Sequence, residues 1–444
     1  MSPPPLGSLL PDVGVQPPGL ASRALAARLR AVESRNVTYV DDEWPVFWEE
    51  AAGANVRDSD GNVYIDLTGG FGVALLGHAH PAVSAAVQGQ ARRLVHGMGD
   101  VHPPALKVRL LERLAELAPW TEARGVLAST GSEAVEIALK TAHLATGKPG
   151  VLAFEGGYHG LTAGALAVTW RPLFRAPFEE RLYRGVAFAP FPGTAVESRA
   201  ALEHARRLLA EGAPNGDAIG AVIVEPVQGR AGVRIAPEGF MAALTAVARE
   251  AGALLIADEL LTGVGRCGAW LASKRVGLEP DLVCLGKALG AGLPLSACVG
   301  RRSVMDAWPE SEGEAVHTST FLGHPLACAA ALGALESAPP GEVAARAEAS
   351  GTSLRERLAE RLSPLPGVVE VRGLGLLIGV ELAASASAPA AAARVAGAAL
   401  RRGLMVLPAG ERGEVVELTP PVTLTEEQAE HAVEVLVSAT GEAL

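Results

Sequence analysis

The stretch LLIADELLTGVGRCGAWLASKRVGLEPDLVCLGKALGAG, residues 254–292, decides the fold class. It contains two short apolar runs, Leu254–Ala257 and Leu282–Leu285, and a charged side chain follows shortly after each. Short apolar runs bounded by turn signals are typical of strands buried in a parallel sheet. Open α/β sheets bind their ligands at the carboxyl ends of such strands, and these two runs bring Asp258 and Lys287 there.

An acid and a lysine at the same edge of one sheet suit pyridoxal phosphate as a cofactor. A lysine amine forms a Schiff base with its aldehyde, and a carboxylate keeps the ring nitrogen protonated so that the ring acts as an electron sink. The alternative is that Lys287 is a surface lysine and Asp258 caps a helix, because strand-end charges are common in α/β proteins. Residues 254–292 alone support both interpretations about equally.

The segment that begins at Gly125 contains a candidate phosphate site. Gly125–Ser129 is predicted to be a strand, and a helix that extends to Ala145 follows the turn containing Gly131 and Ser132. The first backbone N–H groups of a helix have no partner within it and bind anions readily. An ordinary capped helix start explains the same residues, and for this segment alone it is the commoner explanation.

Two further predicted strands bring polar side chains to the same edge of the sheet. The strand Val151–Glu155 is followed by Tyr158, and the strand Ala221–Val224 ends directly before Glu225. Strands alternate with helices from about residue 125 to residue 300, which indicates a mainly parallel sheet built from right-handed βαβ units. So many polar side chains converging on one edge favour a functional site over chance.

Composition and charge exclude several classes of partner. The chain has 444 residues and a net charge of −11 without a basic cluster, which argues against nucleic-acid or anionic-membrane partners. Its four cysteines lack the spacing of a metal site, so we expect buried free thiols in a reducing compartment. No apolar run approaches a membrane span, and the N-terminus lacks the pattern of a signal peptide. We therefore expect a cytoplasmic protein with no metal, no membrane and no nucleic-acid partner.

The two ends of the chain have a different pattern from its middle. Residues 1–20 are rich in proline and should be irregular, whereas Val56–Leu67 contains Asp60-Gly61 between apolar runs, which predicts a β-hairpin. Towards the C-terminus, a helix is predicted over Glu342–Leu362, followed by two strands around a turn at Arg372-Gly373. These segments indicate a second, smaller domain.

Eight motifs, in their order and spacing, resemble those of one family. They are GHAHP (77–81), STGSEAVEIALK (129–140), YHG (158–160), VEPVQG (224–229), LLIADELLTGVGRCG (254–268), LGKALGAGLP (285–294), STFLGHPLACAAAL (319–332) and VRGLGLLIGVEL (371–382). From about residue 40 to its C-terminus, the chain resembles the class III (ornithine/4-aminobutyrate type) pyridoxal-phosphate aminotransferases of fold type I.

The resemblance implies an α/β fold with two domains. The large domain, residues 76–333, would bind the cofactor on a mainly parallel seven-stranded sheet flanked by helices. A smaller α+β domain would combine residues 1–75, which include the N-terminal arm, with residues 334–444.

The resemblance also implies a role for each matching residue around the cofactor ring. Lys287 would form the Schiff base and then move the proton between the substrate Cα and the cofactor. Asp258 would pair with the pyridinium nitrogen, Tyr158 would stack on one face of the ring and Leu260 would cover the other. Glu225 would lie near the phenolic side of the ring as a polar support.

The phosphate and the substrate would be held by other matching positions. Gly131 and Ser132 would bind the phosphate through the helix N-terminus, together with Thr320 of the partner subunit. The active site would therefore be shared within an obligate homodimer. Arg372 would grip a substrate carboxylate with both of its guanidinium N–H groups.

The chain departs from the family at Arg230. Members that act on ω-amino groups often have a glutamate there, which neutralises the carboxylate-binding arginine in the first half-reaction. With Arg230 in its place, our hypothesis is that the site keeps two positive groups, Arg230 and Arg372, and favours carboxylates. The alternative is that Arg230 points to solvent or pairs with another acid. Phe71 and Val73 would line the substrate pocket.

The leading hypothesis for the activity is ping-pong amino transfer from an amino acid or amine to a 2-oxo acid or aldehyde. Racemases, epimerases and aminomutases related to this family need the same lysine, acid and phosphate site, so the motifs do not exclude these activities. A catalytically silent binding protein on the same fold is a third interpretation, which the intact Lys287 and Asp258 disfavour.

Overall fold

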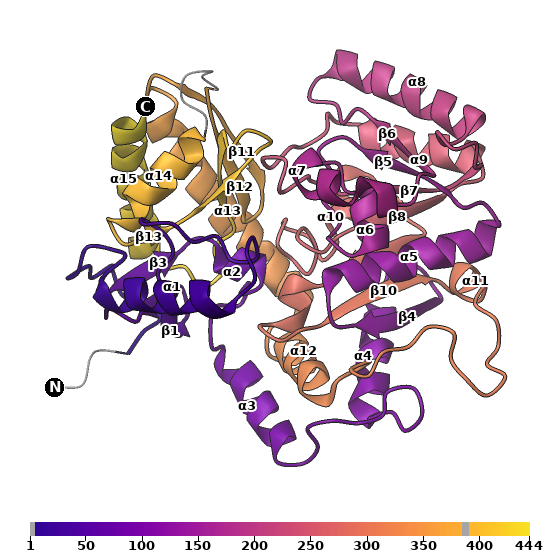
Figure 1. The fold of residues 1–444 in the computed structure, drawn as a ribbon, viewed down its shortest axis with the longest axis horizontal. Coiled ribbons are helices and arrows are strands. Elements are labelled where there is room, and N and C mark those ends of the chain that lie inside the picture. Colours follow the sequence, from indigo (N-terminus) through magenta and orange to yellow (C-terminus); the bar gives the residue numbers. More distant parts are fainter. Residues whose placement is uncertain (1–4, 384–389) are drawn as a thin grey trace. The chain divides into compact units, whose positions relative to one another are not determined.

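A computed structural model describes residues 5–383 and 390–444 of the chain (Figure 1). The chain divides into two compact units, one formed by residues 1–80 with residues 349–444, and the other by residues 81–348. These divisions lie after residues 80 and 348, whereas the sequence led us to expect them after residues 75 and 333. The second division falls inside the long helix α13 (Pro340–Leu362), which has no break in its sequence pattern to mark a boundary.

The larger unit is built on one seven-stranded sheet with the order β4-β10-β9-β8-β7-β5-β6. All of its neighbouring pairs are parallel except those of β10, which is antiparallel to both β4 and β9. The mainly parallel sheet predicted from the sequence is therefore confirmed. The strands are β4 (Ala123–Ala128), β5 (Gly150–Phe154), β6 (Val186–Ala189), β7 (Ile219–Val224), β8 (Leu254–Asp258), β9 (Leu282–Leu285) and β10 (Ser296–Arg301).

Helices cover both faces of this sheet, as Figure 1 shows. Side chains of β8 alternate between two cores: Leu255 and Ala257 belong to the core that includes α4, α8, α9 and α12, and Ile256 belongs to the core that includes α5 and α6. This double burial explains why the strands are continuous apolar runs in the sequence. The helices are α3 (Pro81–Ala91), α4 (Ala105–Glu116), α5 (Gly131–Thr146), α6 (Ala163–Val168), α7 (Pro172–Arg175), α8 (Ala195–Glu211), α9 (Phe240–Glu250), α10 (Ala272–Val276), α11 (Arg302–Met305) and α12 (Pro325–Ser337), with 3-10 turns η1 (Ala176–Arg181) and η2 (Lys287–Gly290).

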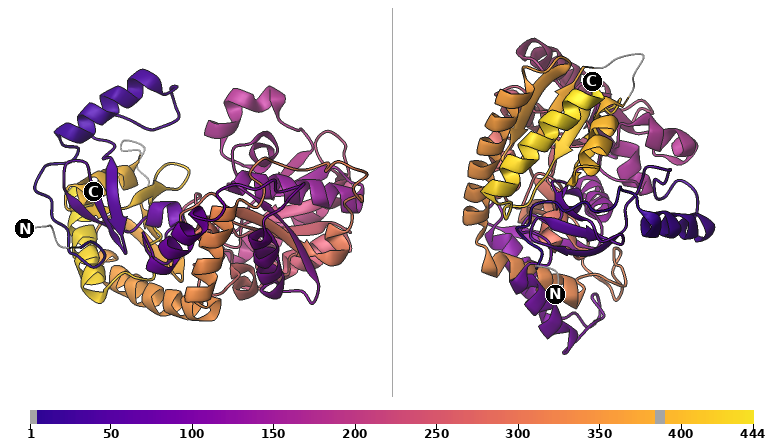
Figure 2. Two further views of the ribbon diagram at one scale, coloured as in Figure 1. Left: turned by 90° about the horizontal axis from the view of Figure 1, so that it is seen from below. Right: turned by 90° about the vertical axis from the view of Figure 1, so that its left-hand side faces the viewer.

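The smaller unit contains two four-stranded sheets, ordered β1-β2-β3-β13 and β11-β12-β15-β14, and both chain termini belong to it (Figures 1 and 2). Its strands are β1 (Trp48–Ala52), β2 (Asn55–Asp58), β3 (Val63–Asp66), β11 (Val368–Leu374), β12 (Leu377–Leu382), β13 (Leu404–Met405), β14 (Leu407–Ala409) and β15 (Val415–Leu418). Its helices are α1 (Leu20–Val32), α2 (Gly69–Gly72), α14 (Ala391–Leu400) and α15 (Glu426–Ala443). The hairpin predicted around Asp60-Gly61 is confirmed by the antiparallel pair β2 and β3.

The position predicted for the second hairpin turn is wrong. Strand β11 continues through Arg372 to Leu374, and Arg372 lies opposite Gly379 of β12. The chain turns after Leu374 instead, where Gly375 has the positive φ angle of 54°. Arg372 is therefore a strand residue whose neighbours are set by the register of two strands.

The proline-rich start of the chain is irregular between residues 5 and 19, as predicted, but it is bound to the smaller unit. The side-chain oxygen of Asn55, at the start of β2, accepts the N–H groups of Gly7 and Leu9 at 3.0 and 2.8 Å. Asp12 pairs with the backbone of Val63. The arm is therefore held by the side chain of Asn55 and by a backbone bridge to the start of β3.

All four cysteines of the chain are buried free thiols, as the sequence led us to expect. Within residues 5–383 and 390–444, no helix has the length and apolar character needed to cross a membrane.

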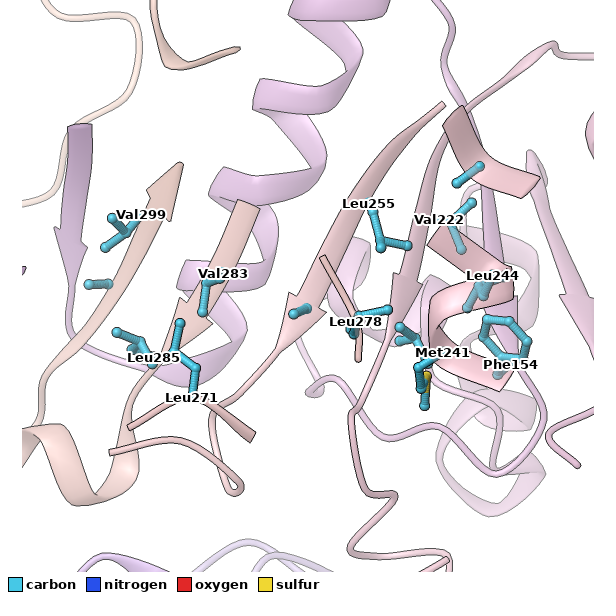
Figure 3. Packing of buried hydrophobic residues seen from close by; sticks show 14 of the residues in the cluster. Phe154, Val222, Met241, Leu244, Leu255, Leu271, Leu278, Val283, Leu285 and Val299 are labelled. Atoms are coloured by element: carbon cyan, nitrogen blue, oxygen red, sulfur yellow. The ribbon is translucent and has the colours of Figure 1, made fainter. Parts of the chain in front are cut away.

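Phe154 anchors the core between the sheet and α9, where Figure 3 shows it beside Met241 and Leu244. Its ring makes edge contacts with Phe191 and Phe240, each at a centroid distance of 6.2 Å. We expect Phe154→Ala to lower the free energy of unfolding by about 3–5 kcal/mol, because it removes buried apolar surface and leaves a cavity. Urea denaturation measures this loss.

Phe178→Ala is the matched control, because the Phe178 side chain is 54% exposed. It should change the free energy of unfolding by less than about 0.5 kcal/mol. Equal losses in the two variants would contradict the placement of Phe154 in the core.

Candidate active site

The carboxylate of Asp258 lies at the end of β8 and is almost completely buried. Its Oδ2 atom is 2.7 Å from Nδ1 of His159, and its Oδ1 accepts the N–H of Leu260 at 3.1 Å. Because side chains alternate along a strand, Asp258 projects from the same face of β8 as Ile256, towards the core that contains α5. The predicted strand-end acid is therefore paired with a histidine and points to the side where α5 begins.

His159 is a functional residue whose role the sequence analysis missed. Burial lowers the pKa of its ring, but the hydrogen bond and charge of Asp258 and the charge of Glu225 outweigh burial, so the pKa is raised. The raised pKa favours the charged form of the ring, whose Nδ1 lies at hydrogen-bond distance from Oδ2 of Asp258. Its presence in the YHG motif was the available signal, but its partner lies 99 residues away in the chain.

Glu225 follows β7 and accepts two backbone hydrogen bonds. Its Oε1 accepts the N–H of Tyr158 at 2.9 Å, and its Oε2 accepts the N–H of Gly229 at 3.3 Å. Burial and the charge of Asp258 raise the pKa of Glu225 to about 7, against the opposing effect of His159. Glu225 therefore titrates near neutral pH while it holds the backbone that precedes His159.

Tyr158 is half-buried, and its ring makes an edge contact with Phe174 at a centroid distance of 5.7 Å. Burial raises the pKa of its phenol, and the positive charge of Arg230 acts in the opposite direction. Arg230 itself is half-buried. The hypothesis that Arg230 serves the substrate and the alternative that it points to solvent or pairs with another acid both remain open.

The start of α5 has the features of an anion site. Thr130 caps the helix, and the side chain of Glu133 reaches back to the N–H groups of Ser129 and Thr130, at 2.7 and 3.1 Å. Among the described residues, the N–H groups of Gly131 and Ser132 donate to no protein acceptor. These two groups are left for a ligand, and the helix dipole favours a negative one.

Leu260 connects this helix start with the loop that carries Lys287. A Cβ atom added to Gly131 would lie 2.9 Å from Cδ1 of Leu260, and one added to Gly286 would lie 2.6 Å from Cδ2. The side chain of Leu260 therefore packs between two glycines, one at the start of α5 and one directly before Lys287. This close packing brings the phosphate-type site and the lysine loop together.

Lys287 is half-buried and begins the short 3-10 turn η2. Strands β8 and β9 run parallel, and Asp258 is paired with Cys284. Lys287 follows shortly after Cys284, so it lies at the same edge of the sheet as Asp258. The φ angle of Lys287 is +46°, a left-handed conformation that costs free energy for a residue with a side chain. Such strained residues are concentrated at active sites, where the surrounding structure holds them in place.

These residues fit pyridoxal phosphate. The open amides of Gly131 and Ser132 suit its phosphate, and the buried acid Asp258, paired with His159, suits a pyridinium nitrogen. Leu260 supplies an apolar surface, and Lys287 supplies the amine that the aldehyde requires. In the larger unit, Leu260 links the strand-end acid Asp258, the start of α5 and the glycine before Lys287, and Glu225 accepts the N–H of Tyr158. Thr320, predicted to serve the partner subunit, is exposed in the segment before α12.

Arg372 belongs to the smaller unit, where its charge is paired with neighbouring acids. Its guanidinium forms ion pairs with Glu370, at 3.0 Å, and with Glu381. Glu370 lies opposite Glu381 across β11 and β12, so Arg372 offsets two like charges on the same hairpin. The neutralising acid missing at residue 230 is thus replaced by two acids next to Arg372 itself.

Phe71 and Val73 also belong to the smaller unit, at the end of α2. Phe71 has a φ angle of 62° between Gly70 and Gly72, which also have positive φ angles, and its side chain is 64% exposed. The turn is held by the buried carboxylate of Asp66, which accepts the N–H of Gly70 at 3.2 Å. The structure therefore presents Phe71 on a tightly held turn, and the pocket-lining role of Phe71 and Val73 stays a prediction.

Comparison with known proteins agrees with this geometry. Residues 38–440 match the family model described as Aminotransferase class-III. An acetylornithine aminotransferase of Methanopyrus kandleri is 40% identical over 89% of this chain and 94% of its own length. A 2-aminoadipate transaminase of Pseudomonas putida is 37% identical over 88% of this chain and 95% of its own length.

Similar solved structures include an ornithine aminotransferase from Toxoplasma gondii with pyridoxal phosphate at partial occupancy in its active site. It superimposes with a TM-score of 0.83 at 30% sequence identity and covers 95% of this chain and 94% of its own. The names of these relatives favour amino transfer over the racemase, epimerase, aminomutase and silent-protein alternatives.

Glu225 should make the stability of the protein depend on pH. Because its pKa is raised from 4.5 to about 7, the native state keeps a proton between these values that the unfolded chain has already released. Stability relative to Glu225→Gln should therefore fall as the pH rises through this window and stay level above it. Chemical denaturation of both proteins at a series of pH values measures the difference.

Glu238→Gln is the control, because Glu238 is exposed at the start of α9. Its effect on the free energy of unfolding should not change with pH over the same window. A Glu225→Gln difference that is equally independent of pH would contradict the raised pKa.

Proposed function

Because this chain belongs to the class III aminotransferases, we propose that Lys287, Asp258 and the open start of α5 form its catalytic centre. The enzyme depends on pyridoxal phosphate and transfers an amino group from a small-molecule donor to an oxo acceptor. One observation carries the assignment of the centre. The buried Asp258–His159 pair and the open amides of Gly131 and Ser132 meet around Leu260, which also packs against the glycine before Lys287.

In this centre, each residue has a defined task. Bound pyridoxal phosphate supplies an aldehyde that condenses with amines and a ring that delocalises the electron pair left at the substrate Cα. Asp258 would hold a proton on the ring nitrogen, and His159 pairs with Asp258 at 2.7 Å. Lys287 would hold the cofactor through its Nζ atom, and the same amine, once the substrate amine has taken its place, would be free to accept and return the proton of the substrate Cα.

Other residues bind and orient the cofactor. The amides of Gly131 and Ser132 bind the phosphate, and the dipole of α5 adds to its affinity. Tyr158 would stack on one face of the ring and Leu260 would cover the other, and together they would exclude water from the reacting bonds. Glu225 supports this arrangement through its hydrogen bond to the N–H of Tyr158.

We further propose that the enzyme acts as a cytoplasmic homodimer in which Thr320 serves the phosphate of the partner subunit. The segment that carries Thr320 packs against residues 96–100: the ring of Phe321 contacts His96, and Thr318 donates to Asp100 at 2.7 Å. Phe321 is 56% exposed and Met98 is 53% exposed, so a second subunit would bury apolar surface here. The buried free thiols suit a reducing compartment.

For the substrate, we propose an acidic amino donor whose additional carboxylate is bound by Arg230. The charge of Arg230 acts on the phenol of Tyr158, beside the cofactor site, whereas the charge of Arg372 is already offset by Glu370 and Glu381. Arg372 would bind the other carboxylate of the substrate only in competition with these acids. The relative named for 2-aminoadipate, a dicarboxylic amino acid, supports this class of donor.

The assignment of Lys287 is tested with Lys287→Ala. We expect turnover to fall by at least about 10³-fold, because the variant loses both the covalent attachment and the proton carrier. Turnover is measured in stopped assays with an amino donor and a 2-oxo acid. In the variant, the visible absorbance of the bound cofactor should also no longer change when donor is added.

Lys274→Ala is the control for this variant, because Lys274 is exposed on α10. It should keep the wild-type rate and the response of the absorbance to donor. Turnover retained in Lys287→Ala would show that another residue carries the proton.

The role of Arg230 is tested with Arg230→Gln. The Michaelis constant for 2-aminoadipate should rise about tenfold or more, because a charge-assisted hydrogen bond is lost, while that for alanine should change little. Steady-state kinetics with both donors and one common acceptor measure the contrast. Arg199→Gln, an exposed position on α8, is the control, and equal effects on both donors would remove the proposed role.

A further inference from the structure

Thr169 is a fully buried residue that caps the C-terminal end of α6. Its Oγ1 accepts the N–H of His159 at 2.9 Å. The same hydroxyl lies 3.1 Å from the carbonyl oxygen of Gly160 and 3.0 Å from that of Ala165, so its proton is shared between these acceptors. One side chain thus holds the backbone on both sides of the His159–Gly160 pair.

This backbone contact matters because the imidazole of His159 is held at only one of its nitrogens. Nδ1 pairs with Asp258 at 2.7 Å, whereas Nε2 is buried and has no hydrogen-bond partner among the described residues. Histidines that orient a functional group are usually fixed through their second nitrogen. Here the ring is oriented by its own backbone, which Thr169 fixes.

The same backbone also reaches the phosphate side of the site. A side chain at Gly160 would collide with Oγ of Ser132, and the N–H of Leu161 donates to that Oγ at 3.2 Å. The segment from His159 to Leu161 therefore has Asp258 at one end and Ser132 at the other. Any shift of this segment would change both ends together.

Thr169 is itself well anchored. Its carbonyl oxygen accepts a hydrogen bond from Arg175 at 3.1 Å, and the carbonyl of Ala167 accepts from the same guanidinium nitrogen at 3.0 Å. The guanidinium of Arg175 lies 4.9 Å from the ring centroid of Phe188, on strand β6. Thr169 is thus tied to the sheet and does not depend on His159 for its position.

We propose that Thr169 is a positioning residue that holds His159 against Asp258, so that Asp258 can keep a proton on the ring nitrogen of the cofactor. The inference rests on the proposed role of Asp258. It adds a residue that lies outside every recognisable motif of the chain, and it predicts that one hydroxyl affects the chemistry of a cofactor that it does not touch.

A purely structural role for Thr169 is the competing explanation, because buried threonines often donate to the carbonyl four residues before them. The chain offers a matched control in Thr245, which is also buried. Its Oγ1 donates to the carbonyl of Met241 at 3.0 Å and accepts the N–H of Glu279 at 3.2 Å. Valine at either position removes the same kinds of hydrogen bond. The hydrogen bonds of Thr245 are made to Met241 and Glu279, which are not residues of the candidate site.

The experiment compares Thr169→Val, Thr169→Ser and Thr245→Val with the wild type. For each, the affinity of the apoprotein for pyridoxal phosphate, the pH dependence of the visible absorbance of the holoenzyme and the stability to urea are measured. We expect both valine variants to lose similar stability. Only Thr169→Val should bind the cofactor about tenfold more weakly and shift the midpoint of the absorbance titration by about half a pH unit or more. Thr169→Ser, which keeps the hydroxyl, should restore both.

If Thr169→Val matches Thr245→Val in cofactor affinity and titration midpoint, the inference is overturned and Thr169 is structural. If Thr169→Val does not fold, Thr169→Ala compared with Thr245→Ala gives the same comparison with a smaller side chain.

A further variant, Asp258→Asn, separates a failure of the role proposed for Thr169 from a failure of the role proposed for Asp258. A shifted midpoint in Asp258→Asn with an unshifted one in the Thr169 variants overturns only the role of Thr169. An unshifted midpoint in Asp258→Asn overturns the role of Asp258 and with it this inference.

Discussion

The contact between Asp258 and His159 is the interaction on which the rest of the site depends. Moving two charged groups out of water costs several kcal/mol for each, and only close pairing with further hydrogen bonds offsets this cost. Both side chains are nearly inaccessible, and the sheet supplies the required geometry through three neighbouring strands. β8 delivers Asp258, β5 leads to His159, and β7 between them delivers Glu225. Because Glu225 is buried and lies close to the charge of Asp258, its pKa lies above the usual range of a carboxyl group, although His159 acts in the opposite direction.

The site also depends on three glycines at positions where a side chain would not fit. Leu260 fits between Gly131 and Gly286, and Gly160 leaves room for the hydroxyl of Ser132. A methyl group at any of these glycines would separate the start of α5 from the lysine loop or from the segment that carries His159. These glycines are therefore required for close approach, which is a different requirement from the positive φ angle that explains many turn glycines.

The sequence was most informative about functional residues that lie at or directly after the end of a buried strand. Asp258, Glu225 and Lys287 follow buried apolar runs, so their shared edge could be predicted from pattern alone. What the pattern could not show is pairing between distant segments. The partner of His159 lies at the end of β8, Thr169 reaches His159 by folding of the loop after β5, and β10 runs antiparallel to both of its neighbours, β4 and β9. Each of these depends on tertiary contacts that leave no local signal.

Arg372 shows how the same limitation affects an inference about specificity. The absence of a glutamate at residue 230 suggested that Arg372 keeps its full charge, but the register of β11 and β12 places Glu370 opposite Glu381 and both beside Arg372. Two carboxylates facing each other on a hairpin are destabilising unless a cation lies between them. The arginine therefore stabilises the hairpin itself, and if it binds a substrate carboxylate as predicted, that carboxylate has to compete with Glu370 and Glu381. The substrate charge that such a site prefers depends on which strands bring carboxylates near each arginine. The residue at a single motif position is not enough to predict it.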